Sequence, residues 1–149
     1  MKVLHGSAAA EAPAPVDDCF ALLADVEGYP RWYPEVVRQV AVTERRPDGR
    51  AALARVRLHV SVGPLARDVE LLLAVAEVAP ATVTLTRVPS AGRDSEQFSV
   101  AWRLDERTAG TNIELALDAE LDVPRLVPTG GVGDSLAQGF VAAAGRALT

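Results

Sequence analysis

The feature that most constrains this chain is a series of six segments in which apolar and polar residues alternate. The segments span residues 36–44, 51–62, 67–78, 82–88, 96–105 and 111–122. Such alternation is typical of a β-strand with one buried face. The turns between the segments, such as Pro47-Asp48-Gly49 and Ala109-Gly110, are too short for the crossovers that parallel neighbours need. The sequence therefore predicts an antiparallel sheet with one apolar face.

The segments that flank this series supply one further strand and the helices. Residues 3–11 favour a first strand, which gives seven strands in all. A helix is expected over 15–24, where Asp17 and Asp18 suit its first turn, and a single helical turn over 31–34. After Pro128 the apolar spacing becomes helical, and a helix over about 128–148 carries a stripe of Val132, Leu136, Gly139, Phe140, Ala143 and Ala147. We expect one α+β domain over 1–149, with this last helix covering the apolar sheet face.

Composition narrows the class of partner. The 149 residues carry a formal net charge of -5, which argues against nucleic acid, because nucleic-acid binding rests on Lys and Arg. No apolar run is long enough to span a membrane, so stable membrane insertion is not expected. Cys19 is the only cysteine, and the first residues lack an apolar signal segment, so a cytoplasmic location is predicted. The oligomeric state is left open.

Residues that could carry out catalysis are few and lie in ordinary structural positions. His59 shares a polar strand face with Arg55, Arg57 and Ser61, and is expected to face solvent. Cys19 lies on the apolar stripe of the first helix, where a free cysteine behaves as a small hydrophobe. Two histidines and one cysteine do not supply the ligands of a zinc site. We therefore predict no catalytic residues, no metal and no cofactor.

The apolar sheet face and the last helix should enclose a pocket for a small molecule. We expect a volume of a few hundred Å³. Gly139 leaves two interpretations open: an unfilled volume, or close packing of the helix against the sheet. Arg38 is placed with Val36, Val40 and Val42 on an apolar face, and Thr84 would face the pocket if its strand had that phase. The predicted pocket lining is Val56, Leu58, Leu71, Leu73, Phe98, Val100, Trp102, Leu115, Leu136 and Phe140.

The order of elements and three local motifs resemble the START/SRPBCC superfamily, the helix-grip fold of Bet v 1-like proteins. The most specific motif is Asp25-Val26-Glu27-Gly28-Tyr29-Pro30-Arg31-Trp32-Tyr33-Pro34, which is similar to the opening D-x-E-x-Y-P-x-W/F-x-P of that superfamily. Ser61-Val62-Gly63-Pro64-Leu65 and Val100-Ala101-Trp102-Arg103-Leu104 resemble motifs of its polyketide cyclase/dehydrase and coenzyme Q-binding branch. The resemblance covers nearly the whole chain.

The resemblance implies a deep cavity between a curved sheet and the last helix, with Trp32 and Tyr33 at its mouth. It also favours the unfilled volume at Gly139. Members bind lipids, quinones, polyketides or other apolar ligands, so we predict binding or carriage of such a molecule. Two alternatives stay open: a polyketide aromatase/cyclase, which would need inward acid or base groups, and a protein-interaction module like the toxin-like members.

Overall fold

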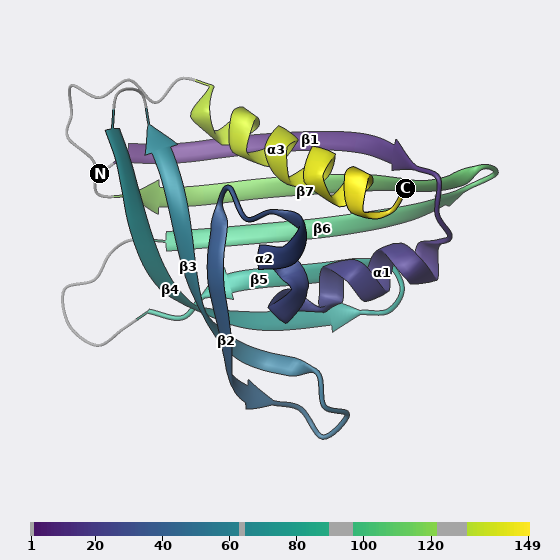
Figure 1. The fold of residues 1–149 in the computed structure, drawn as a ribbon, viewed down its shortest axis with the longest axis horizontal. Helices are drawn as coiled ribbons and strands as arrows, with labels where there is room; N and C mark the ends of the chain where they lie inside the picture. The colour runs from purple at the N-terminus through teal and green to yellow at the C-terminus, as the bar shows by residue number, and fades with distance from the viewer. Residues whose placement is uncertain (1, 63–64, 90–96, 122–130) are drawn as a thin grey trace.

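A computed structural model describes residues 2–62, 65–89, 97–121 and 131–149. Over these ranges strands and helices follow one another along the chain (Figure 1). They are β1 (Lys2–Ala12), α1 (Val16–Ala24), the short 3-10 helix η1 (Val26–Gly28), α2 (Tyr29–Trp32), β2 (Val37–Arg45), β3 (Ala51–Val62), β4 (Leu65–Val78), β5 (Thr82–Arg87), β6 (Gln97–Arg107), β7 (Gly110–Leu121) and α3 (Val132–Ala147).

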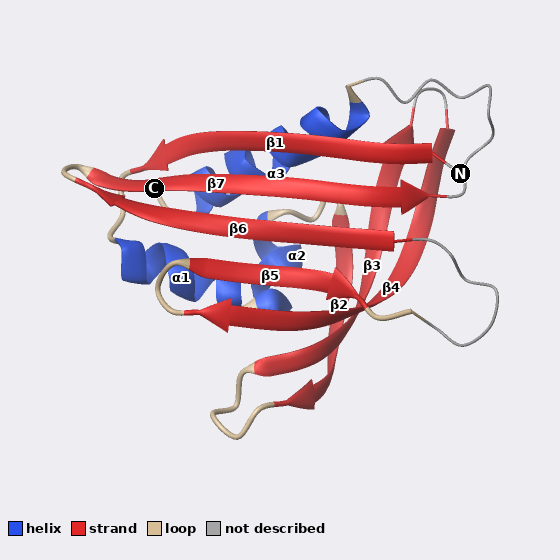
Figure 2. Cartoon of the chain, turned by 180° about the vertical axis from the view of Figure 1, so that it is seen from behind, coloured by secondary structure: helices blue, strands red, loops and turns tan. Residues whose placement is uncertain are grey.

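All seven strands form one antiparallel sheet in the order β1-β7-β6-β5-β4-β3-β2. The α+β prediction is thereby confirmed, with short helices between the first two strands and a long helix at the end. The predicted start of that helix at about 128 lies outside the described residues. The helices lie on one side of the sheet, and β2, β3 and β4 bend around them (Figure 2). The sheet therefore has a concave face that is covered and a convex face that is open.

The covered face contains the residues that the alternation marks as apolar. In β6 the buried positions are Phe98, Val100, Trp102 and Leu104, and in β7 they are Ile113, Leu115, Leu117 and Ala119. The register pairs Val100 with Leu117 and Trp102 with Leu115, so these side chains form continuous rows across the sheet. A single core therefore lies between the sheet and the helices.

A β-bulge in β2 reverses the side-chain phase that we predicted for Arg38. Val37 pairs with Leu58 and is 1% exposed, but the next paired residue on β2 is Gln39, opposite Arg57. The extra residue lets Val40 and Val42 return to the inner face, while Arg38 is exposed. The expectation that Arg38 faces the pocket is wrong, because simple alternation does not anticipate an inserted residue.

The phase of β5 is also opposite to the one that would bring Thr84 inward. Val83 and Leu85 are buried, and they pair with Trp102 and Val100 on the inner face. Because neighbouring side chains point to opposite faces of a sheet, Thr84 lies on the convex side, where it is half-buried. Thr84 is therefore not a pocket residue.

Helix α3 is rotated by about one residue relative to the predicted stripe. Its buried residues are Gly133, Ala137, Phe140, Val141, Ala143 and Ala144, whereas Leu136 is half-buried and Ala147 is exposed. Sequence spacing alone admits both stripes, since Phe140 and Ala143 belong to each. The contact of α3 with β1 decides between them.

That contact brings two backbones together at a pair of glycines. A Cβ atom at Gly133 would overlap the carbonyl group of His5, and one at Gly6 would overlap the carbonyl group of Gly133. Beside this crossing, the backbone N–H of Ser7 donates a hydrogen bond of 3.1 Å to Asp134 Oδ1. The start of α3 is therefore fixed on β1 by a close approach that only glycine permits.

Gly133→Ala should lower the free energy of unfolding by about 1–3 kcal/mol, because the new methyl group forces α3 away from β1. The control is Gly145→Ala in the same helix, where a Cβ atom meets nothing within 4 Å. This control should stabilise the protein by up to about 1 kcal/mol, the usual preference of a helix for alanine. Urea denaturation measures both. An unchanged stability of Gly133→Ala would show that the two backbones are not in contact.

Candidate functional site

A cavity of about 30 Å³ lies between the concave sheet face and the helices. Its wall combines residues of η1, α2, β2–β6 and α3, which come from most of the length of the chain. Only apolar atoms face the cavity. The lining residues are Val26, Tyr29, Val37, Val40, Val56, Leu58, Leu73, Leu85, Phe98, Val100 and Phe140.

Six of the ten residues predicted to line the pocket do line this cavity. Leu71, Trp102 and Leu115 are buried in the surrounding core but do not contribute to its wall, and Leu136 lies outside it. Five further wall residues were not predicted to line the pocket: Val26, Tyr29, Val37, Val40 and Leu85. Val37 could not be found without knowledge of the bulge, whereas Val40 lies on the strand face that alternation marks as apolar. Tyr29, by contrast, belongs to the motif around residues 25–34 and was available as a candidate.

The size of the cavity contradicts the predicted few hundred Å³. A volume of about 30 Å³ holds little more than one water molecule, for which about 10–15 Å³ suffices. Drug-sized ligands need about 300–1,000 Å³. The cavity is therefore a small residual space within a packed core, and any ligand larger than a few atoms has to displace side chains.

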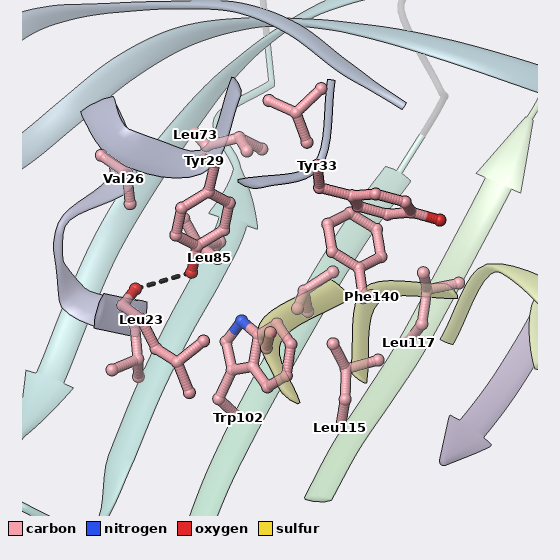
Figure 3. Close-up of a cluster of buried hydrophobic side chains, with 14 of the residues drawn as sticks. Leu23, Val26, Tyr29, Tyr33, Leu73, Leu85, Trp102, Leu115, Leu117 and Phe140 are labelled. Atoms are coloured by element: carbon pink, nitrogen blue, oxygen red, sulfur yellow. Dashed lines mark hydrogen bonds between the residues drawn. The ribbon is translucent and has the colours of Figure 1, made fainter. Parts of the chain in front are cut away.

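Aromatic side chains of Tyr29, Trp32, Tyr33, Trp102 and Phe140 pack against one another at the cavity, and Figure 3 shows all of them except Trp32. Phe140 of α3 makes edge contacts with Tyr33 and Trp102, at centroid distances of 4.8 Å and 6.2 Å. Trp32 stacks on Tyr33 at 6.3 Å and lies 4.8 Å from the ring of Tyr29. These rings join α2 to α3 and to β6. They therefore occupy the volume in which a larger pocket was expected.

The polar atoms of this aromatic cluster do not line the cavity. The hydroxyl of Tyr29 donates a hydrogen bond of 2.6 Å to the carbonyl oxygen of Leu23 (Figure 3), and burial raises the pKa of this phenol. The indole nitrogen of Trp32 is buried and has no hydrogen-bond partner among the described residues, and that of Trp102 is buried beside the hydroxyl of Tyr29. The wall of the cavity therefore offers a ligand apolar contact and very little hydrogen bonding.

Gly139 faces Tyr33 rather than an empty volume. A Cβ atom at Gly139 would overlap the hydroxyl oxygen of Tyr33 and lie 3.1 Å from the ring carbon that bears it. Tyr33 is 8% exposed, and burial raises the pKa of its phenol. Of the two interpretations of Gly139, close packing is therefore correct, although the partner is a side chain of the α2–β2 connection and not the sheet.

Four further residues were predicted to contact the ligand, namely Trp32 and Tyr33 at the cavity mouth and Arg38 and Thr84 within the pocket. Trp32 is half-buried and stacks on Tyr33, and Tyr33 is buried and contacts Phe140 of α3. Arg38 and Thr84 contribute to neither this cluster nor the cavity wall, for the reasons of strand phase given above. Of these four residues, the structure therefore brings together the aromatic pair that was predicted at the cavity mouth.

An open cleft of about 380 Å³ lies outside the cavity, between the start of α3 and the ends of β2 and β3. The half-buried side chains of Val36, Val132 and Leu136 provide its apolar part. The polar lining residues are Glu35, His59, Ser61 and Ser135, and Gly131 completes the wall. We call this feature the outer cleft. Leu136, which was predicted to face the internal pocket, belongs to it because of the rotation of α3.

His59 and Cys19 differ in their surroundings, as the sequence indicated. His59 is half-buried on the convex side, and its Nδ1 lies 2.8 Å from Asp68 Oδ1 on the neighbouring strand. Cys19 is fully buried, and burial raises the pKa of its thiol, so the reactive thiolate is disfavoured. Of these two groups, His59 alone is accessible to a ligand, at the outer cleft.

Within the described ranges no cluster of three or more His, Cys, Asp or Glu side chains is arranged to hold a metal ion. Among the described helices, none is both long enough and apolar enough to cross a membrane.

Known structures share this fold. A START superfamily protein from Mycobacterium smegmatis superposes with a TM-score of 0.79 at 17% identity, over 97% of each chain. A protein from Thermus thermophilus gives 0.72 at 20% identity, over 97% of this chain and 96% of that chain. An aromatase/cyclase from a Streptomyces species gives 0.58 at 22% identity, over 98% and 86%. At these identities the likeness is one of fold.

No curated protein sequence matches the chain significantly. A family model does match it over residues 4–149, which is almost its entire length, and that family is described as polyketide cyclase/dehydrase and lipid transport. The match agrees with the helix-grip arrangement of sheet and helices described above. The chain therefore belongs to the polyketide cyclase/dehydrase and lipid transport family.

Proposed function

We propose that this protein binds an apolar small molecule in the space now divided between the internal cavity and the aromatic cluster. The observation that carries the proposal is the wall of the cavity, to which ten strand and helix side chains and one tyrosine ring present only apolar atoms. Burial of an apolar ligand contributes about 25 cal/mol per Å² before the costs of ordering. Binding should therefore show a negative heat-capacity change.

Ligand uptake requires the cavity to grow, and Tyr33 is the residue whose movement would allow this. Its ring contacts Phe140, a wall residue, and its hydroxyl fits against Gly139. Tyr33 follows the four-residue helix α2, whose backbone has few internal hydrogen bonds to lose. We propose that outward movement of Tyr33 frees Phe140 to turn, which would merge its volume with the cavity.

The carrier role is favoured over the aromatase/cyclase alternative by the same wall. A cyclase needs groups that exchange protons with its substrate. Among the residues that line the cavity, Tyr29 has the only titratable side chain, and its hydroxyl is bonded to a backbone carbonyl with its pKa raised. Arg38, which the sequence placed on an apolar strand face, is exposed. Binding without turnover is therefore the simpler account.

Dye binding should depend on the cavity volume in both directions. N-phenyl-1-naphthylamine is a neutral dye that fluoresces strongly in apolar surroundings, and we expect the wild-type protein to bind it. Val100→Phe fills the cavity and should weaken binding about tenfold or more, since it overpacks the site. Phe98→Leu enlarges the cavity and should strengthen binding while costing about 1 kcal/mol of stability.

The control for this test is Val78→Phe, the same substitution at a position that is 67% exposed. It should leave dye affinity unchanged. Thermal melts confirm that each variant is folded. The proposed function would be contradicted if the wild-type protein failed to bind the dye, or if neither cavity variant changed the dye affinity.

Tyr33→Ala should accelerate dye association, because the obstacle between solvent and Phe140 is removed. Stopped-flow fluorescence gives the association rate constant, which is lower when binding requires a conformational change. We expect a rise of about tenfold for Tyr33→Ala and little change for Tyr33→Phe, which keeps the ring. Equal rates in wild type and Tyr33→Ala would mean that the ligand takes another route.

A further inference from the structure

We infer that the outer cleft binds the polar end of an amphipathic ligand whose apolar tail occupies the internal cavity, and that this polar end is an uncharged or cationic hydrogen-bond donor. The inference rests on the proposed function, because it assigns a second part to the same site. It names a ligand class that an apolar cavity alone does not specify: a single-chain amphiphile with a hydroxyl or amino end, in preference to a carboxylate or phosphate.

The outer cleft and the cavity adjoin each other at the start of β2, at β3 and at α3. Val36 lines the cleft and Val37 lines the cavity, and the same relation holds for His59 and Leu58. On α3, Leu136 lines the cleft and Phe140, one turn later, lines the cavity. The two spaces therefore lie on opposite sides of the backbone at the start of β2 and along β3, and they are one helical turn apart on α3.

The two spaces differ in size and in polarity. The cavity is small and wholly apolar, whereas the outer cleft is about 380 Å³ and combines apolar and polar lining. A ligand with a polar end cannot bury that end in the cavity without losing its hydrogen bonds to water, which costs free energy. The outer cleft, next to the Tyr33 side of the cavity, offers replacement partners.

The described lining of the outer cleft carries negative charge. Glu35 supplies a carboxylate, Ser61 and Ser135 supply hydroxyls, and neither lysine nor arginine belongs to its described lining. An anionic group in the cleft would therefore approach a like charge without a counter-ion. An ammonium group would gain an opposite charge, and a hydroxyl would be tolerated.

A contact with Asp68 orients the ring of His59. Because a carboxylate only accepts hydrogen bonds, the 2.8 Å contact with Asp68 means that Nδ1 carries the proton and donates it. When the ring is neutral, its Nε2 is therefore unprotonated and accepts a hydrogen bond. Asp68 and His59 are directly opposed on β4 and β3, so the strand pairing maintains this orientation. The cleft thus presents two acceptors, Glu35 and His59, to a donor group.

The test compares three probes with the same eight-carbon tail: octylamine, 1-octanol and octanoic acid. At about pH 7 the first is cationic, the second neutral and the third anionic. Calorimetric titration at low salt should rank their affinities as amine, then alcohol, then acid. Each step should be about two- to fivefold, the range of an exposed ion pair.

Glu35→Lys should reverse the order of amine and acid. The control is Glu44→Lys, an exposed position of β2 that changes the net charge of the protein equally but does not line the cleft. It should preserve the order and thereby separate a local effect from the overall charge. His59→Phe should lower octanol and octylamine affinity by about two- to fivefold and leave octanoic acid nearly unchanged.

Equal affinities for the three probes, the tightest binding for octanoic acid, or the same reversal in Glu44→Lys would overturn the inference. In each case N-phenyl-1-naphthylamine should still bind, and the proposed function stands. The inference also fails if the dye binds and no octyl probe does. If neither the dye nor any octyl probe binds, the proposed function fails with it.

Discussion

Helix α3 can approach strand β1 closely because each carries a glycine where they cross. The carbonyl groups of His5 and Gly133 occupy the places where side chains would otherwise begin, and the Ser7 N–H reaches Asp134 beside them. This contact sets the rotation of the helix. With that rotation Phe140 faces the cavity, Gly139 receives Tyr33, and Leu136 turns toward the outer cleft. A rotation by one residue would exchange these roles, so the site depends on the crossing.

Much of the architecture follows from periodicity in the sequence. Alternation in β3, β6 and β7 gave the correct inward residues, because these strands are regular and one of their faces is buried. The antiparallel order followed from the short turns. The motif around Tyr29 and Trp32 was specific enough to suggest the family. Six cavity residues were found in this way, since each is the inward member of a regular strand or lies on both possible helix stripes.

The incorrect predictions have physical causes that cannot be read from a pattern in one sequence. Arg38 was misplaced by one inserted residue in β2, which is a property of the pairing with β3. Thr84 lies in a short strand in which threonine alternates with valine and leucine. That alternation alone does not tell which of the two sets faces inward. The helix stripe was ambiguous until the glycine pair was seen. The cavity was overestimated because the packing of Tyr33 against Gly139 and Phe140 fills it, and such a contact joins residues far apart in the chain.

The central claim is that an apolar tail enters the core between the sheet and α3, and intermolecular nuclear Overhauser effects test it most directly. In a complex of the protein with 1-octanol, the terminal methyl protons of the probe should show effects to the methyl groups of Val56, Leu73 and Val100, which line the cavity. Effects confined to Val36, Val132 and Leu136 would place the whole probe in the outer cleft. That result would contradict the account.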